Sequence, residues 1–206
     1  MNITVIGGTG TTGSAVVAEA ARRGHTVTSV SRSGTRPDGA RTAVAADLAD
    51  TDAVVALVND ADVTVIAVSP DRAGGPTQPT VDAFAALINA RPTGRLVVGG
   101  AGSLLDEQGQ RLVDSPSPAF LEEWRPEALA LATVLELLRE AGDALAWTFV
   151  SPAPMYPVAE ATTGRYAVGA DTPAGERLSA ADLALALVDE AERDAHRGVR
   201  FTVASA

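Results

Sequence analysis

Three glycines follow a short apolar segment with the spacing Gly7-x-x-Gly10-x-x-Gly13. Residues 2–6 (NITVI) predict a strand before them, and residues 12–23 predict a helix after them. In such a unit the first glycine permits a tight turn, the second allows a pyrophosphate close to the backbone, and the third permits close helix packing. The helix N-terminus adds free N–H groups and a partial positive charge. The segment predicts a dinucleotide-binding turn. Its residues are Gly7, Thr9, Gly10, Thr11, Thr12 and Gly13.

The end of the second predicted strand indicates which dinucleotide is preferred. Proteins that bind NAD usually carry Asp or Glu there, about 20 residues after the turn, whereas this chain has Ser31, Arg32 and then Arg36. A guanidinium can pair with a 2′-phosphate, and one charge-assisted contact contributes ~2 kcal/mol. We therefore expect NADP(H) rather than NAD(H). The alternative is that Arg32 is only a solvated loop residue.

Later strand ends are expected to supply the remaining coenzyme contacts, because parallel strands end at the same edge of a sheet. Asp47, with Leu48 beside it, could reach the adenine, or Asp47 could cap a helix instead. The ends of the fourth and fifth strands are expected to lie along the ribose, pyrophosphate and nicotinamide. The residues at these positions are Ala67, Val68, Ser69, Gly99, Gly100 and Ala101, and Pro152, after the sixth strand, is expected to contact the nicotinamide as well.

Two hydroxyl groups are the candidates for orienting or protonating a substrate. Ser103 lies just past the fifth strand, and Tyr156 lies in the segment after the sixth strand, beside Met155. We expect Met155 and Pro152 to shape the nicotinamide pocket. Ordinary loop polarity is the alternative for each hydroxyl. The two histidines, His25 and His196, stand apart without a paired carboxylate, so neither a metal site nor a hydrolase triad is predicted.

The composition excludes several other functions. The 206 residues contain no cysteine, which removes disulfides, thiolate nucleophiles and cysteine-ligated metals. The net charge of −10 disfavours nucleic acid, and no apolar run approaches the ~18 residues of a membrane span. All 16 basic residues are arginine. We expect no signal peptide, a cytoplasmic location, a small-molecule substrate, and a monomer or homodimer.

The elements that must position these residues alternate along the chain. Continuous Val/Ile runs predict strands buried on both faces, and their alternation with helices predicts βαβ units. The strands are expected at 2–6, 26–31, 41–46, 63–68, 95–100, 146–150 and 200–204, and the helices near 12–23, 51–59, 78–90, 124–141 and 179–193. The predicted fold is a single α/β domain (1–206) with a Rossmann-type, doubly wound, mostly parallel sheet. Pocket loops are expected at 69–79, 102–118 and 151–176, and the last could contain short strands.

The chain resembles the atypical short-chain dehydrogenase/reductases with a compact NAD(P)H-binding fold, a group that includes NmrA-like and biliverdin reductase B/flavin reductase-like proteins. The resemblance covers the whole chain in order. The matching segments are GGTGTTG (7–13), GHTVTSVSR (24–32), ADLAD (46–50), LVVGGAGSL (96–104), EEWRPEALA (122–130), WTFVSPAPM (147–155) and HRGVRFTVA (196–204). It implies a Rossmann fold and a nicotinamide coenzyme, but it does not specify the substrate.

The resemblance also shows where this chain departs from its better-known relatives. Those relatives use Tyr-x-x-x-Lys to protonate a carbonyl, but this chain has no lysine. Similar compact members often have Tyr-Lys where this chain has Trp124-Arg125. Trp124 and Arg125 are therefore expected to contact substrate, with Arg125 holding a ribose hydroxyl or a substrate anion. An arginine cannot act as a titrating acid near neutral pH.

These observations favour an NADPH-dependent oxidoreductase that transfers a hydride to a small conjugated acceptor such as a quinone, flavin or enone. Such acceptors can take their proton from solvent, which suits a chain without a strong general acid. Two alternatives remain open: a non-catalytic NADP(H)-binding redox sensor, or an isomerase or epimerase that uses bound NAD(P).

Overall fold

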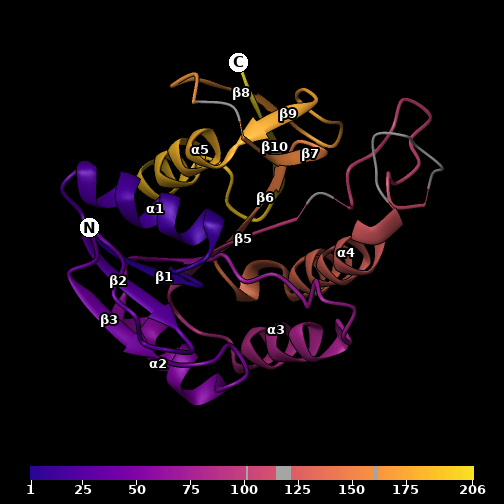
Figure 1. Ribbon diagram of the computed structural model, residues 1–206. Helices are drawn as coiled ribbons and strands as arrows, with labels where there is room; N and C mark the ends of the chain where they lie inside the picture. Colours follow the sequence, from indigo (N-terminus) through magenta and orange to yellow (C-terminus); the bar gives the residue numbers. More distant parts are fainter. Residues whose placement is uncertain (101, 115–121, 160–161) are drawn as a thin grey trace.

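The alternation of strands and helices is present in the computed structural model, which describes residues 1–100, 102–114, 122–159 and 162–206 (Figure 1). The strands are β1 (Asn2–Ile6), β2 (Thr26–Ser31), β3 (Thr42–Ala45), β4 (Val63–Ile66), β5 (Arg95–Gly99), β6 (Trp147–Pro152), β7 (Met155–Val158), β8 (Tyr166–Gly169), β9 (Arg177–Ser179) and β10 (Arg200–Ser205). The helices are α1 (Thr11–Arg22), α2 (Thr51–Asp60), α3 (Gln78–Ala90), α4 (Arg125–Ala141) and α5 (Ala180–Arg193), with short 3-10 turns η1 (Glu122–Trp124) and η2 (Gly142–Ala144).

The main sheet has the strand order β3-β2-β1-β4-β5-β6-β10-β8. All neighbours pair in parallel except β8, which pairs antiparallel with β10 at the edge. The order of the first six strands is that of the Rossmann fold, and its direction reverses between β1 and β4. Ligands of such sheets bind at this reversal, beyond the carboxyl ends of the strands. The predicted fold class is confirmed.

Helices cover both faces of the sheet, as the continuous apolar strands predict. Helices α1 and α5 lie side by side on one face, and α2, α3 and α4 cover the other (Figure 1). Successive strand residues point to opposite faces of the sheet. In β4, Val65 packs on the face that α1 and α5 cover, and Ile66 packs on the face that α2, α3 and α4 cover. Two of the few aromatic residues, Trp147 and Phe149 of β6, are buried on the face that α2, α3 and α4 cover.

The glycine turn between β1 and α1 has the backbone that its sequence predicts. Gly7 has a φ of +84°, a conformation that L side chains rarely adopt, and its N–H donates to the Val30 carbonyl at 2.8 Å. Gly13 lies in the first turn of α1, directly against Gly7. A Cβ on Gly13 would lie 2.1 Å from the Gly7 carbonyl oxygen. The third glycine therefore sets how closely α1 approaches the sheet.

The segment predicted as the third pocket loop is described at residues 151–159 and 162–176. They contain the end of β6, the strand β7 and the strand β8, and β7 pairs with β9 in a separate two-stranded sheet. This small sheet lies near the carboxyl ends of β6 and β10 (Figure 1). These short strands are the alternative that the sequence left open for this segment.

A buried carboxylate, Asp182 at the start of α5, anchors this segment. Its side chain accepts hydrogen bonds from the hydroxyls of Thr162, Ser179 at 2.8 Å, and Ser205 at 2.7 Å. Ser179 Oγ in turn accepts the Asp182 N–H at 3.1 Å, which caps the N-terminus of α5. Burial alone would raise the pKa of Asp182, but the hydrogen bonds from Thr162, Ser205 and Ser179 outweigh it and lower the pKa.

Replacing Asp182 with asparagine is expected to lower the free energy of unfolding by about 3 kcal/mol, because it removes a buried charge from several donors. The lowered pKa means that the stabilisation is present above about pH 4 and is lost as the pH falls through the folded-state pKa. Urea unfolding at neutral and acid pH measures both effects. Asp38→Asn, at an exposed turn position, is the matched control. An equal midpoint for D182N and D38N would contradict the anchoring role.

Both histidines have carboxylate partners, which corrects the prediction that they lack one. His25 Nε2 lies 2.8 Å from Glu192 Oε1, and His196 Nδ1 lies 2.8 Å from Glu190 Oε2. His196 also stacks on Phe201. Neither histidine lines the cavities described below, so these pairs join elements of the fold. None of the helices in the described ranges is long and apolar enough to cross a bilayer.

Candidate functional site

A groove of about 720 Å³ runs over the carboxyl ends of β1, β2 and β4, beside the N-terminus of α1. It lies at the reversal of strand order, where the fold predicts a ligand. Most of the coenzyme-binding residues predicted from the sequence line it. These are Gly7, Thr9, Gly10, Thr11, Thr12, Ser31, Arg32, Asp47, Leu48, Ala67, Val68 and Ser69.

The N-terminus of α1 fits a phosphate. The first N–H groups of a helix have no partner within it, and here the N-cap residue is Gly10, which has no side chain to cap them. The first turn of α1 carries no acidic residue that would repel an anion. A Cβ built on Gly10 would have only one protein atom beyond the neighbouring residues within 4 Å, the Gly7 carbonyl oxygen at 3.4 Å. Because Gly10 lines the groove and has no Cβ, a ligand can approach its backbone closely. The residues present therefore fit the pyrophosphate of a dinucleotide.

The part of the groove beyond β2 and β3 holds residues on which the sequence-based prediction of NADP(H) over NAD(H) rests. Arg32 follows β2, is exposed, and lines the groove. Asp47 lines it too, but its Oδ1 also accepts the N–H of Ala49 at 2.9 Å, which fixes the turn after β3. Arg36 is exposed and does not line the groove. Of the two predicted arginines, the structure therefore brings only Arg32 to this surface.

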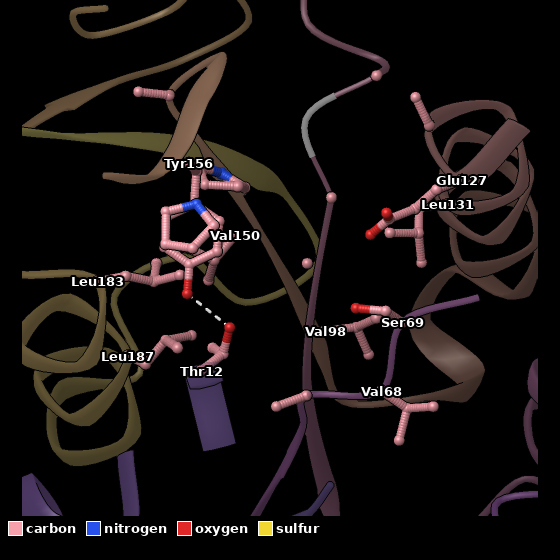
Figure 2. A pocket seen from close by; sticks show the side chains of 18 of the residues that line it. Thr12, Val68, Ser69, Val98, Glu127, Leu131, Val150, Tyr156, Leu183 and Leu187 are labelled. Atoms are coloured by element: carbon pink, nitrogen blue, oxygen red, sulfur yellow. Dashed lines mark hydrogen bonds between the residues drawn. The ribbon is translucent and has the colours of Figure 1, made fainter. Parts of the chain in front are cut away.

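A second cavity of about 330 Å³ joins the groove at the ends of β4, β5 and β6. The two share Thr12, Ala67, Val68, Ser69, Arg72, Tyr156 and Pro157. Its walls are mainly apolar, as is usual for sites that hold small planar molecules. Leu183 and Leu187 of α5 lie on one side, and Leu131 of α4 lies on the other (Figure 2). Predicted residues that line this cavity are Gly99, Gly100, Trp124, Pro152, Met155 and Tyr156.

Tyr156 places a hydroxyl group inside this cavity. Its oxygen lies 2.5 Å from Thr12 Oγ1, so a hydrogen bond joins β7 to the first turn of α1 (Figure 2). Burial raises the pKa of Tyr156, and the opposing effects of the Thr12 hydrogen bond and the Arg72 charge do not cancel it. The phenol therefore stays protonated at neutral pH. It can donate a hydrogen bond to an oxygen bound beside it.

An ion pair crosses the mouth of the same cavity. Arg72, in the loop after β4, donates from Nε to Glu127 Oε2 at 2.6 Å and from Nη2 to Glu127 Oε1 at 2.5 Å. Glu127 lies in the first turn of α4, and its side chain is only 17% exposed. The hydrogen bonds to Glu127 raise the pKa of the Arg72 guanidinium. Two parallel hydrogen bonds fix the plane of the guanidinium as well as its position.

Four of the predicted site residues are not brought to these cavities. Ser103 is 5% exposed and accepts a hydrogen bond from Arg200 Nη1 at 3.3 Å, so its hydroxyl serves the packing of β10. Arg125 lines a separate surface depression with Thr77 and Gln78, at the N-terminus of α3, and does not line the cavity that contains Trp124. Gly13 is used for helix packing, and Arg36 is solvent-exposed. Ala101 lies outside the described residues.

Sequence reasoning missed the ion pair and the apolar wall. Arg72 lies in the loop 69–79, whose position at the ligand edge was the available signal, but its partner Glu127 is 55 residues away. Leu183 and Leu187 share one face of α5, where a spacing of four predicts only a buried stripe. Of the other predicted pocket loops, residues 102–114 contribute Gly102 alone, and residues 151–176 contribute Pro152 to Val158.

This sheet order, the bare helix N-terminus and the two joined cavities define a dinucleotide-binding Rossmann protein. Comparison with known sequences gives the family: residues 7–194 match the NAD(P)H-binding family. The chain belongs to this family. The resemblance inferred from the glycine turn and the later segments is confirmed at this level, and the coenzyme is a nicotinamide dinucleotide.

Full-length relatives share the fold and a third of the sequence. The Bacillus subtilis protein YwnB is 35% identical, with 100% of this chain and 99% of YwnB covered. A crystal structure from Streptococcus pneumoniae, provisionally named an NADH-flavin reductase, is 33% identical with a TM-score of 0.83 and complete coverage of both chains. A Bacteroides thetaiotaomicron structure, provisionally named an epimerase, is 31% identical with a TM-score of 0.81, covering 99% of this chain and 96% of that one.

Proposed function

We propose that this protein is an NADPH-dependent reductase that passes a hydride to a small conjugated acceptor of the quinone, flavin or enone type. The observation that carries the proposal is the continuity of the two cavities: a dinucleotide groove opens directly into an apolar chamber that contains one phenol. The name given to the Streptococcus pneumoniae relative supports a reductase. The protein would be of the atypical short-chain dehydrogenase/reductase type, since the chain has no lysine for a Tyr-x-x-x-Lys motif.

The preference for NADPH rests on Arg32. No acid stands directly after β2, so no carboxylate at that position would hold the two hydroxyls of a bare ribose or repel a phosphate. The Arg32 side chain is exposed on the groove and can turn toward a 2′-phosphate. A planar guanidinium suits this group because two of its N–H donors can reach two phosphate oxygens.

The residues of this chain would contribute to the reaction by positioning the acceptor, excluding water from it and donating a hydrogen bond to it. When bound, the reduced coenzyme supplies the hydride, and one proton completes reduction of a quinone to a hydroquinone. The apolar walls from β5, β6 and α5 exclude water from the acceptor. Tyr156 would donate its O–H to the acceptor oxygen as negative charge develops there, and Thr12 orients the phenol. Solvent at the cavity mouth replaces the proton.

Replacing Tyr156 with phenylalanine is expected to lower kcat/KM for quinones and enones about 30-fold, the value of one hydrogen bond of ~2 kcal/mol to developing charge. The Kd for NADPH should change less than about threefold, because the ring remains. The raised pKa predicts that the wild-type rate has no basic limb assigned to Tyr156 below about pH 10. Steady-state kinetics from pH 6 to 9 measure both. An unchanged kcat/KM in Y156F would remove this residue from the mechanism.

The proposal itself is tested by mixing the purified protein with NADPH and a panel of quinones, flavins and enones, and following the loss of nicotinamide absorbance. Turnover of several acceptors is the expected result. Calorimetry with NADPH, run in parallel, separates binding from chemistry. Tight NADPH binding with no turnover of any acceptor would replace the reductase with a coenzyme-binding sensor.

A further inference from the structure

The cavity of about 330 Å³, here called the acceptor cavity, is lined by few charged side chains, and their charges cancel. Among its lining residues in the described part of the chain, the charged side chains are Arg72 and Glu127. Each meets the other through two hydrogen bonds, of 2.5 and 2.6 Å. The remaining polar groups, such as Tyr156 and Ser69, are neutral. A molecule entering this cavity therefore meets apolar walls, hydroxyl groups and an ion pair with no net charge.

We propose that Glu127 is a specificity-determining residue that holds Arg72 away from incoming ligands and so restricts the site to uncharged acceptors. This inference rests on the proposed reductase function and deepens it by naming the acceptor class: neutral, planar, conjugated carbonyl compounds such as quinones without phosphate, sulfonate or carboxylate groups. Among flavins, the same arrangement would favour riboflavin over flavin nucleotides, which carry a phosphate.

Geometry gives Glu127 this role. Its side chain is only 17% exposed, at the start of α4, and Figure 2 shows it on the side of the cavity opposite Tyr156. The bidentate contact directs Nε and Nη2 of Arg72 to the carboxylate. An anionic acceptor would have to displace that carboxylate from Arg72 and then lie beside it. The largely buried Glu127 carboxylate would repel an anion placed beside it, and solvent at the 59% exposed Arg72 side chain screens part of this repulsion, so a moderate preference for neutral acceptors is expected.

The volume of the cavity and the net charge of the protein also favour small, neutral acceptors. The cavity of about 330 Å³ lies at the small end of ligand sites, which span roughly 300 to 1,000 Å³. The chain as a whole carries a net charge of −10, so long-range steering also disfavours anions. A compact neutral ring system meets neither obstacle.

The test uses two pairs of acceptors that share a ring system and differ in charge: a naphthoquinone with its sulfonated derivative, and riboflavin with FMN. Binding is measured by calorimetry in the presence of oxidised NADP, where no turnover occurs, and kcat/KM is measured with NADPH. In the wild-type protein the neutral member should bind at least about tenfold more tightly, which is ~1.4 kcal/mol. Glu127→Gln frees Arg72 and should reduce the preference to about twofold or less.

Two further variants test whether the change in acceptor preference comes from the freed Arg72 and not from a general loss of negative charge. Adding Arg72→Met to E127Q should restore the preference for neutral acceptors, since the freed cation is then gone. Glu136→Gln removes the same charge from the same helix at an exposed position, where Glu136 pairs with Arg139, and should change nothing. Thermal unfolding of each variant confirms that it is folded.

The outcomes separate this inference from the reductase proposal. Equal binding of the neutral and anionic quinones by the wild-type protein would overturn the inference, whatever the turnover. An E127Q variant that tightens NADPH binding but leaves acceptor preference unchanged would also overturn it, because Arg72 would then serve the coenzyme. Selective binding of neutral quinones without turnover would reject the reductase and retain the role of Glu127. Failure to bind any acceptor would reject both.

Discussion

Alanine in place of Gly13 is expected to lower the free energy of unfolding by about 3 kcal/mol and to weaken nicotinamide coenzyme binding at least ~100-fold. The added Cβ would lie 2.1 Å from the Gly7 carbonyl oxygen, 2.7 Å from its carbon and 2.8 Å from the Gly8 Cα. All three are backbone atoms, so no flexible side chain can move aside. Helix α1 must retreat from β1, which moves the N–H groups that face the groove.

Urea unfolding and coenzyme titration of this variant measure the two effects. Gly10→Ala is the matched comparison: Gly10 has an ordinary φ of −78°, and its added Cβ would come no closer than 3.4 Å to the protein. We expect G10A to keep its stability within about 0.5 kcal/mol and to bind coenzyme about 30-fold more weakly. Alanine is the better helix former by about 1 kcal/mol, so a G13A protein more stable than wild type would disprove the clash.

Reversal of charge at Arg32 has the second largest expected effect. Arg32→Asp should change the ratio of the Kd values for NADPH and NADH by about 100-fold in favour of NADH. Loss of the charge-assisted contact contributes ~2 kcal/mol, and repulsion between the new carboxylate and the 2′-phosphate supplies the rest. The Kd for NADH should change less than about threefold, because that coenzyme carries no phosphate at this position. Fluorescence titration with both coenzymes measures the ratio.

Arg36→Asp provides the control for net charge. Arg36 is also exposed and follows the same strand, but it does not line the groove. The same two-unit change in charge should therefore alter the NADPH:NADH ratio less than about threefold. If R32D weakens both coenzymes equally, or if R36D acts as strongly as R32D, the 2′-phosphate is not recognised by Arg32.

Local patterns were enough to predict the groove. The strand–turn–helix unit around Gly7 and Gly13 and the ends of β2 and β4 depend on residues close in sequence. A parallel sheet then brings the strand ends to one edge, whatever lies between them. Most of the residues predicted from these signals to bind coenzyme line the observed groove.

The acceptor half depends on contacts between distant residues, which a single sequence does not encode in any local pattern. Thr12 and Tyr156 are 144 positions apart, and Arg72 and Glu127 are 55 apart. Two predictions based on proximity in sequence were wrong. Ser103 follows β5 but accepts a hydrogen bond from Arg200, and Arg125 adjoins Trp124 but lines a different surface depression. One step along a helix turns a side chain by about 100°, so neighbours in a motif need not share a site.

The pairing of β10 has a consequence for how the molecule is made. This strand lies between β6 and β8 and provides the hydrogen bonds that both need on one side. Because β10 follows both β6 and β8 in the sequence, each of these strands keeps an open edge until β10 is in place, when the glycine turn is already formed. A chain cut before β10 would expose these edges, and exposed strand edges pair readily with other chains.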